Sequence, residues 1–139
     1  MKKVLILCTG NSCRSQMAHG FLKSFDNSLD VHSAGVKPGL QVNPIAINVM
    51  KETGIDISDH RPVNVDRYIG TEWDYVITVC DNAKETCPLF TGKVKHKLHM
   101  SFEDPSEFKG TEEEIINRFR KIRDEIRDTF QTFYNEQLK

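Results

Sequence analysis

Apolar and polar residues follow one another along this chain in a pattern that predicts strands alternating with helices. Lys3–Leu7 is a short apolar run that ends at a turn signal, which predicts a buried strand. From Arg14 onward, apolar residues recur at helical spacing, which predicts a helix. The residues with this spacing are Met17, Ala18, Phe21, Leu22 and Phe25. The chain therefore opens as strand, loop and helix.

The same order repeats further along the chain. Leu29–Ala34 alternates ahead of a glycine, which predicts a second strand. Pro44 suits the first turn of a helix, and the apolar residues after it predict a helix that closes at Gly54. Tyr75–Val79 is a β-branched run and predicts a third strand, while Val94–Leu98 gives a weaker pattern for a fourth.

The clearest pattern is at the end of the chain, where apolar residues step by three or four and charged residues fill the opposite face. The apolar stripe is Ile115, Phe119, Ile122, Ile126, Phe130 and Phe133. This stripe predicts a long amphipathic helix that packs on a core and binds no ligand.

Strands that alternate with helices indicate the α/β class, here an open parallel four-stranded sheet with helices on both faces. The chain has 139 residues, 38% of them hydrophobic, and no long Pro/Gly/Ser-rich stretch divides it, so we expect a single domain over 1–139. Ligands of such folds bind at the carboxyl ends of the strands. Cys8 and Cys80 each follow a predicted strand directly, so we expect both at that edge.

Composition and charge limit the cellular compartment and the classes of binding partner that we expect for this protein. The net charge is -1 and the charges are spread along the chain, which argues against nucleic acid and against an anionic membrane surface. The apolar run Val4–Leu7 is shorter than the roughly 7 to 15 residues of a secretory h-region, and no segment approaches the about 20 apolar residues of a membrane span. We therefore expect a cytoplasmic protein, in which four cysteines favour catalysis, metal binding or redox work over structural disulfides.

The segment Cys8–Ser15, CTGNSCRS, places a cysteine at a strand end, then a loop, then a helix N-terminus. Successive backbone N–H groups and a helix N-terminus form a cradle for an anion. The same cradle stabilises a negative sulfur, so we expect Cys8 to titrate below the ~8.5 of a free cysteine and to be a thiolate nucleophile at neutral pH. The residues expected around the anion are Thr9, Gly10, Asn11, Ser12, Cys13, Arg14 and Ser15.

Within this loop, the residue types suggest separate roles. Gly10 permits a backbone conformation with positive φ, and Asn11 is suited to bracing the loop. Arg14 offers a planar fork of donors to two oxygens of a tetrahedral anion, and Ser15 can hydrogen-bond the sulfur. Cys13 has no strand end and no obvious partner, so packing is the favoured interpretation over a second nucleophile.

At this point the residues resemble a known family. A cysteine, five residues and Arg-Ser after an N-terminal strand is similar to the low-molecular-weight tyrosine phosphatase superfamily, and CTGNSCRSQMA is closer to its thioredoxin-coupled arsenate reductase branch. The resemblance spans nearly the whole chain and implies the low-molecular-weight phosphatase-like fold. Its further marks are SAG at Ser33–Gly35, the helix start Asn43-Pro44, VITVC at Val76–Cys80, CP at Cys87 and DP at Asp104.

The resemblance assigns Cys80 and Cys87 as relay thiols, which form a redox-active disulfide that thioredoxin reduces. The polar residues between them carry no apolar anchor, which suits a segment that moves while thiols exchange. Two inert packing cysteines remain the alternative, and a zinc site would need further ligands, for which His96 and His99 are the candidates. The resemblance also selects Asp104 over Glu103 as the general acid, although a DP dipeptide by itself usually marks a turn.

Two positions differ from the family pattern and limit which site residues can be assigned from the resemblance. Some reductases of this branch build a cation site from an asparagine, a glutamate, a serine and an aspartate. Here Asn11 and Ser33 fit, but His19 stands at the glutamate and Val63 near the aspartate, so we expect no metal. His19 itself is expected to be a solvated helix residue.

The resemblance thus implies an enzyme that reduces arsenate to arsenite for arsenic detoxification, with phosphate and sulfate as competing oxyanions. It implies no tightly bound cofactor and thioredoxin as electron donor, and we expect a monomer. One alternative is a phosphatase, which needs only the loop, Cys8, Arg14 and Asp104. Another is a phosphocysteine carrier domain, which also has a cysteine after its first strand but needs neither the Asp-Pro acid nor the further cysteines.

Overall fold

The structure is a computed structural model that describes residues 2–81 and 87–139. Its strands are β1 (Lys3–Cys8), β2 (Asp30–Gly35), β3 (Trp73–Thr78) and β4 (Val94–His99). Its longer helices are α1 (Arg14–Phe25), α2 (Pro44–Lys51) and α4 (Glu112–Phe133). Short helical segments are η1 (Val65–Arg67), η2 (Pro105–Glu107) and η3 (Tyr134–Leu138). Each predicted strand and helix is therefore present, with bounds that differ by a few residues.

The strands form one parallel sheet in the order β2-β1-β3-β4. Cys8, the last residue of β1, pairs with Gly35 at the end of β2, and Leu7 pairs with Thr78 at the end of β3. Because the sheet is parallel, these strand ends share one edge. Cys80 follows β3 by two residues, so the predicted edge holds both Cys8 and Cys80.

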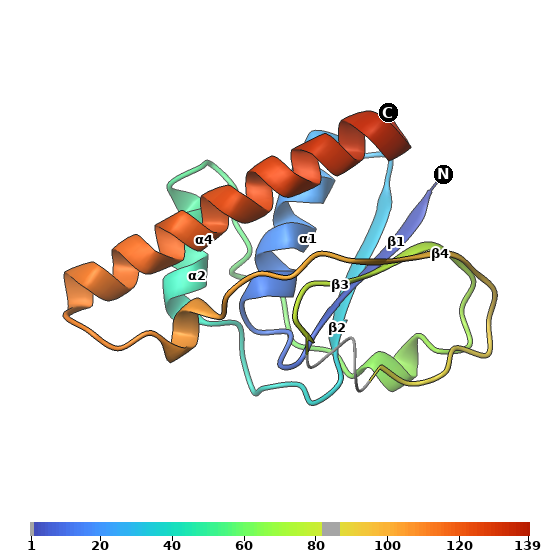
Figure 1. The fold of residues 1–139 in the computed structure, drawn as a ribbon, viewed down its shortest axis with the longest axis horizontal. Helices are drawn as coiled ribbons and strands as arrows, with labels where there is room; N and C mark the ends of the chain where they lie inside the picture. The colour runs from blue at the N-terminus through green and yellow to red at the C-terminus, as the bar shows by residue number, and fades with distance from the viewer. Residues whose placement is uncertain (1, 82–86) are drawn as a thin grey trace.

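Helices α1, α2 and α4 contact one another and gather on one side of the sheet (Figure 1). The other side carries η1 and the chain after it, where the Tyr68 ring packs edge-on against Trp73 and tilted against His32. The α/β class and the parallel four-stranded sheet with helical segments on both faces are confirmed. Among the residues that the structure describes, no helix is both long and apolar enough to cross a membrane.

Local sequence explains where the helices begin. Asn43 caps α2 by accepting the backbone N–H groups of Ile45 and Ala46, directly before Pro44. Thr111 and Glu114 form a reciprocal capping box at the start of α4, each accepting the other's backbone N–H. Such caps satisfy donors that have no partner within the helix.

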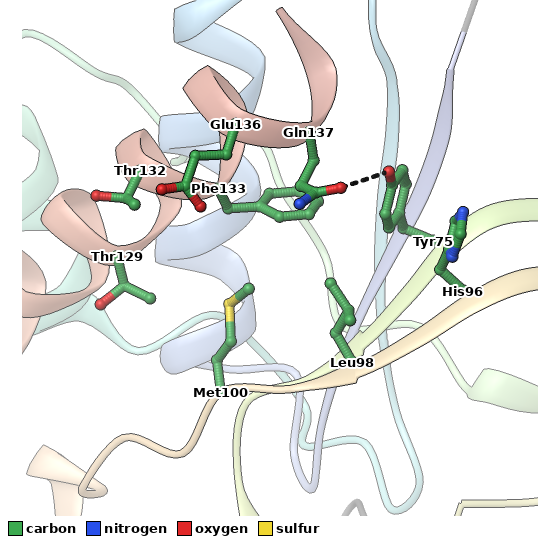
Figure 2. A pocket seen from close by; sticks show the side chains of 9 residues that line it. All are labelled: Tyr75, His96, Leu98, Met100, Thr129, Thr132, Phe133, Glu136 and Gln137. Atoms are coloured by element: carbon green, nitrogen blue, oxygen red, sulfur yellow. Dashed lines mark hydrogen bonds between the residues drawn. The ribbon is translucent and has the colours of Figure 1, made fainter.

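The predicted stripe on α4 is buried at Phe119, Ile122, Ile126, Phe130 and Phe133. Figure 2 shows the far end of this packing, where the chain after α4 lies over the sheet and Tyr75 donates to Gln137 at 3.4 Å. The residues drawn there surround a hollow of about 460 Å³. It contains neither a cysteine nor an arginine, so it does not fit the chemistry expected of this chain.

Candidate active site

The Cys8 sulfur lies inside the loop that joins β1 to α1. It accepts the backbone N–H of Asn11 at 3.1 Å, and its Sγ lies 2.9 Å from the Ser15 hydroxyl. The predicted contact between Ser15 and the sulfur is therefore present. Cys8 is only 2% exposed, so the sulfur is covered by the loop that also supplies its donors.

Asn11 is the residue that fixes the loop's shape. Its φ of 50° lies in the left-handed region, its Nδ2 donates to Ser15 Oγ at 2.7 Å, and its Oδ1 accepts the Val63 N–H at 3.0 Å. The expectation that Asn11 braces the loop is confirmed. The expectation of positive φ at Gly10 is wrong, because asparagine tolerates the left-handed region and the turn is made one residue later.

The outer side of the loop is held by the segment after β2. The carbonyls of Thr9, Gly10 and Ser12 accept N–H groups from residues 37, 39 and 43 at 2.9, 2.9 and 2.7 Å. This bonding occupies the loop's acceptors, so an anion in the loop meets its N–H groups. No local signal in the sequence indicated that residues 37–43 would brace the loop.

The protonation state expected for Cys8 is not what the structure supports. Burial is the largest influence and raises the pKa of the Cys8 thiol, while Ser15, the Asn11 N–H and the positive Arg14 lower it. The net direction is upward, opposite to the lowered pKa that the loop motif predicts. The physical reason is desolvation: the loop donors do not fully replace the water that a buried thiolate loses.

Arg14 begins α1 and is anchored at both ends of its guanidinium. One nitrogen donates to the Phe102 carbonyl at 3.0 Å, and the other lies 3.5 Å from an Asp104 carboxylate oxygen. Asp104 in turn caps η2 by accepting both the N–H and the hydroxyl of Ser106, at 2.9 and 2.7 Å. Its neighbour Glu103 instead pairs with Arg118 at 3.1 Å. Asp104 therefore faces Arg14, whereas Glu103 points to another cation.

Cys80 lies beside the same loop. Its Sγ is 3.4 Å from the Thr9 hydroxyl, and it is 3% exposed. Cys80, Arg14 and Asp104 line one hollow of about 490 Å³ at the carboxyl edge of the sheet, together with Thr9. The structure thus brings a second thiol to the cysteine loop, in the hollow that Arg14 and Asp104 also line.

Sequence comparison decides which family contains this arrangement. The model of the family described as low molecular weight phosphotyrosine protein phosphatase matches residues 3–139. The chain belongs to this family.

Within the low molecular weight phosphatase family, several relatives that resemble this chain are arsenate reductases. An arsenate reductase of Halalkalibacterium halodurans is 44% identical over 133 residues, which cover 95% of this chain and 94% of the relative. A solved arsenate reductase in the phosphate binding state aligns with a TM-score of 0.82 and 30% identity, covering 98% of each chain. A thioredoxin-dependent arsenate reductase of Corynebacterium glutamicum aligns with a TM-score of 0.61 and 30% identity, covering 95% of this chain and 63% of that one.

The other thiols of this family member lie in different surroundings. Cys87 is half-buried in a hollow of about 380 Å³ beside Thr78, Lys97 and His99, and does not line the hollow that holds Cys80. Burial raises the pKa of the Cys87 thiol and the Lys97 charge opposes that shift. The polar residues 82–86, predicted to move during thiol exchange, lie outside the described residues. All four cysteines are free.

Cys13 is buried in the same loop as Cys8. Burial raises the pKa of its thiol well above the ordinary range, and Asp104 and Cys8 add to the shift. A thiol that is this difficult to ionise is a poor nucleophile, which agrees with the packing role expected for it.

His19 corrects another expectation. Its Nδ1 lies 2.9 Å from Ser33 Oγ, its ring centroid is 4.7 Å from that of His60, and burial lowers its pKa to about 3. It is therefore a neutral packing residue and not a solvated one. Among residues 2–81 and 87–139, no group of three His, Cys, Asp or Glu side chains is arranged to hold a metal ion.

Gln16 is a supporting residue that the sequence did not single out. Its buried amide donates to the Asn11 carbonyl at 3.1 Å and to the Arg61 carbonyl at 3.2 Å, and its oxygen lies 2.9 Å from His60 Nδ1. A glutamine on a predicted helix gives no signal of such a role. Only the approach of residues 60–61 to the loop reveals it.

Proposed function

We propose that this protein reduces arsenate to arsenite through a relay of Cys8, Cys80 and Cys87, with thioredoxin as the electron donor, in arsenic detoxification. One observation carries the proposal. A second thiol, Cys80, lies beside the Cys8 loop and opens into the hollow that Arg14 and Asp104 also line. Hydrolysis has no use for that thiol, whereas reduction through a cysteine requires one. The similar proteins named above are arsenate reductases.

In the first step, the loop N–H groups and the Arg14 fork bind the oxyanion. The Cys8 thiol passes its proton to an oxygen of the bound arsenate, and its sulfur attacks arsenic to form a sulfur–arsenic bond while a bond from arsenic to another oxygen breaks. Asp104 gives a proton to the departing oxygen, which leaves as water. Because Arg14 is held by Phe102 and Asp104, its fork is already oriented before the anion arrives.

In the second step, the Cys80 thiolate attacks the Cys8 sulfur. A Cys8–Cys80 bond forms and the sulfur–arsenic bond breaks. The bonding electron pair stays on arsenic, which is reduced from As(V) to As(III) and leaves as arsenite. Cys87 then attacks Cys80, releasing Cys8 as a thiol and leaving a Cys80–Cys87 disulfide.

Thioredoxin, a dithiol protein, supplies two electrons to that disulfide and closes the cycle. The similar C. glutamicum protein is thioredoxin-dependent, which supports this choice of donor. The cycle uses no tightly bound cofactor, and phosphate and sulfate compete for the loop because they share the tetrahedral shape of arsenate. We place the reaction in the cytoplasm, where thiols are kept reduced, and expect the protein to act as a monomer.

The second candidate is phosphate monoester hydrolysis. The family and the arrangement of Cys8, Arg14 and Asp104 favour it, since these three groups provide a nucleophile, an anion site and an acid. We propose it as a weaker side activity, because it leaves the placement of Cys80 unexplained.

The deciding experiment compares the two reactions in one preparation. Purified protein is given arsenate with thioredoxin, thioredoxin reductase and NADPH, and NADPH consumption and arsenite are measured. Hydrolysis of an aryl phosphate is followed in parallel. We expect catalytic arsenite formation that stops when thioredoxin is omitted. Rapid hydrolysis without arsenite formation would replace the proposal with the phosphatase.

A further inference from the structure

The imidazole of His99 contacts the chain on both sides of Cys80. His99, the last residue of β4, stands opposite Thr78 of β3 in the sheet register. Its Nδ1 lies 2.7 Å from the Thr78 hydroxyl, and its Nε2 lies 2.9 Å from an Asp81 carboxylate oxygen. Thr78 precedes Cys80 by two residues and Asp81 follows it directly. We call this set of three residues the His99 clasp.

The backbone hydrogen bonds from the neighbouring strand hold the chain ahead of Cys80. The Met100 N–H donates to the Thr78 carbonyl at 2.8 Å, and the Phe102 N–H donates to the Val79 carbonyl at 3.2 Å. The acceptors of both bonds precede Cys80 in the sequence. The contact between His99 and Asp81 extends the attachment to the residue after it, so Cys80 is fixed from both directions.

The chemistry of the clasp suits positioning. When the Thr78 hydroxyl donates to Nδ1, the Nε2 N–H donates to the Asp81 carboxylate, which makes a charge-assisted bond with a fixed direction. The Asp81 side chain is 76% exposed, so the pair contributes little to global stability. The pair instead fixes the local position of the chain from Thr78 to Asp81, and Cys80 is the reactive residue in that segment.

The clasp also reaches the other relay thiol. Thr78 and His99 line the hollow that holds Cys87, while Asp81 lines the hollow that holds Cys80. The imidazole therefore contacts both surroundings in which a relay thiol lies. His99 itself does not line the Cys80 hollow, in which Arg14 and Asp104 also lie, and reaches it only through Asp81.

We propose that His99 is a positioning residue for the relay, which acts through Asp81 and Thr78 to hold the Cys80 sulfur for attack on Cys8. This inference rests on the proposed reductase function and assigns a role beyond the three cysteines. In the step concerned, the Cys8–Cys80 bond forms, the sulfur–arsenic bond breaks, and the electron pair goes to arsenic. His99 contacts none of these atoms, so hydrolysis at Cys8 should not depend on it.

The test uses a Cys87→Ser background, in which the reaction stops after one arsenite per protein. His99→Asn, Asp81→Asn and the double variant are compared for the rate of that single release and for aryl-phosphate hydrolysis. We expect release to slow by about tenfold or more, since small displacements of a reacting group cost that much, while hydrolysis is retained. The double variant should be no slower than His99→Asn, because Asp81→Asn weakens the same contact that His99→Asn removes.

His96→Asn is the matched control. His96 lies on the same strand, is exposed, and stacks on Tyr75 at the hollow of Figure 2, away from the clasp. It should change neither reaction. Normal release from His99→Asn, or an equal loss of release and hydrolysis in both Asp81→Asn and His99→Asn, would overturn the positioning role.

A second readout needs no arsenate and separates this inference from the proposed function. Labelling of Cys80 by iodoacetamide, followed by mass spectrometry, should become severalfold faster in His99→Asn and Asp81→Asn, with Cys8 labelling unchanged. If the parent protein forms no arsenite, the proposed function fails, and unchanged Cys80 labelling would separately refute the clasp.

Discussion

The Cys8 sulfur is subject to opposing influences that a motif does not reveal. The Ser15 hydroxyl, the Asn11 N–H and the Arg14 charge stabilise its thiolate, yet burial outweighs them and raises the pKa of the thiol. In the free protein, the reactive fraction of Cys8 is therefore small at neutral pH and grows as the pH rises.

This balance predicts the pH dependence of Cys8 alkylation. Below the pKa of a thiol, the thiolate fraction rises about tenfold for each pH unit, so iodoacetamide labelling of Cys8 should accelerate steadily from pH 7 to pH 9. Ser15→Ala removes a donor and should slow labelling at pH 8. Quantitative mass spectrometry of the Cys8 peptide measures both effects.

Ser24→Ala is the control for that substitution, because Ser24 lies on the same helix but donates to the Phe21 carbonyl, away from the loop. It should leave the labelling rate of Cys8 unchanged. A rate that is level between pH 7 and pH 9 would mean that Cys8 is already ionised and would contradict the direction of the shift.

At the scale of elements, α1 contacts the sheet through a neutral histidine. His19 on α1 meets Ser33 on β2 and the ring of His60, and burial lowers the pKa of both histidines. Protonating His19 would place a charge where burial and the neighbouring His60, His32 and Lys23 all disfavour it.

The lowered pKa of His19 predicts a loss of stability in mild acid. The unfolded chain binds a proton near pH 6.5 and the folded chain only near about 3, so the unfolded state holds more protons between these values. Stability is therefore complete above pH 6.5 and falls as the pH decreases, by about 2 kcal/mol from His19 between pH 7 and pH 5.

Urea unfolding at the two pH values measures this effect. The His19→Gln variant should lose clearly less stability between pH 7 and pH 5 than the parent, whereas the exposed His96→Gln should behave like the parent. An identical loss in His19→Gln and the parent would show that the acid sensitivity has another origin. The range from pH 7 to pH 5 lies above the pH at which carboxylates with lowered pKa values, such as Glu52 and Asp74, lose their contribution to stability.

At the scale of the whole molecule, the parallel sheet gathers Cys8 and Cys80 at one edge, while Cys87 lies in a separate hollow. A relay over these three positions has two separable stages. The first joins Cys80 to Cys8 at the edge, and the second needs Cys80 and Cys87 to meet, which requires a change of conformation.

The two stages predict different behaviour for two serine variants. Cys87→Ser should release about one arsenite per protein and then stop, because the Cys8–Cys80 disulfide still forms. Cys80→Ser should release little arsenite, since no positioned thiol resolves the arseno-cysteine. Both should retain aryl-phosphate hydrolysis, and mass spectrometry after digestion locates any trapped disulfide. Continued turnover of Cys80→Ser with thioredoxin would refute the relay.

Much of the fold and part of the site were determined by local sequence. Periodicity and neighbouring residues predicted three features of the chain. These are the strand that ends at Cys8, the loop from Cys8 to Arg14, and the apolar stripe of α4. Local patterns therefore predicted the alternating strands and helices of a parallel α/β sheet and the shared edge of Cys8 and Cys80, whereas the strand order β2-β1-β3-β4 came from the structure. The contact between Ser15 and the sulfur followed in the same way, because the loop between β1 and α1 brings the two residues together.

Tertiary structure alone decided what surrounds those residues. Four contacts of the site join segments that are distant in sequence. They are the bond from Arg14 to the Phe102 carbonyl, the bond from the Val63 N–H to Asn11, the bond from the Gln16 amide to the Arg61 carbonyl, and the His99 clasp. The protonation of Cys8 belongs to the same group, because the desolvation that raises its pKa is produced by the whole packed core. Spacing along a chain records local partners, whereas burial and long-range contacts exist only once the chain has folded.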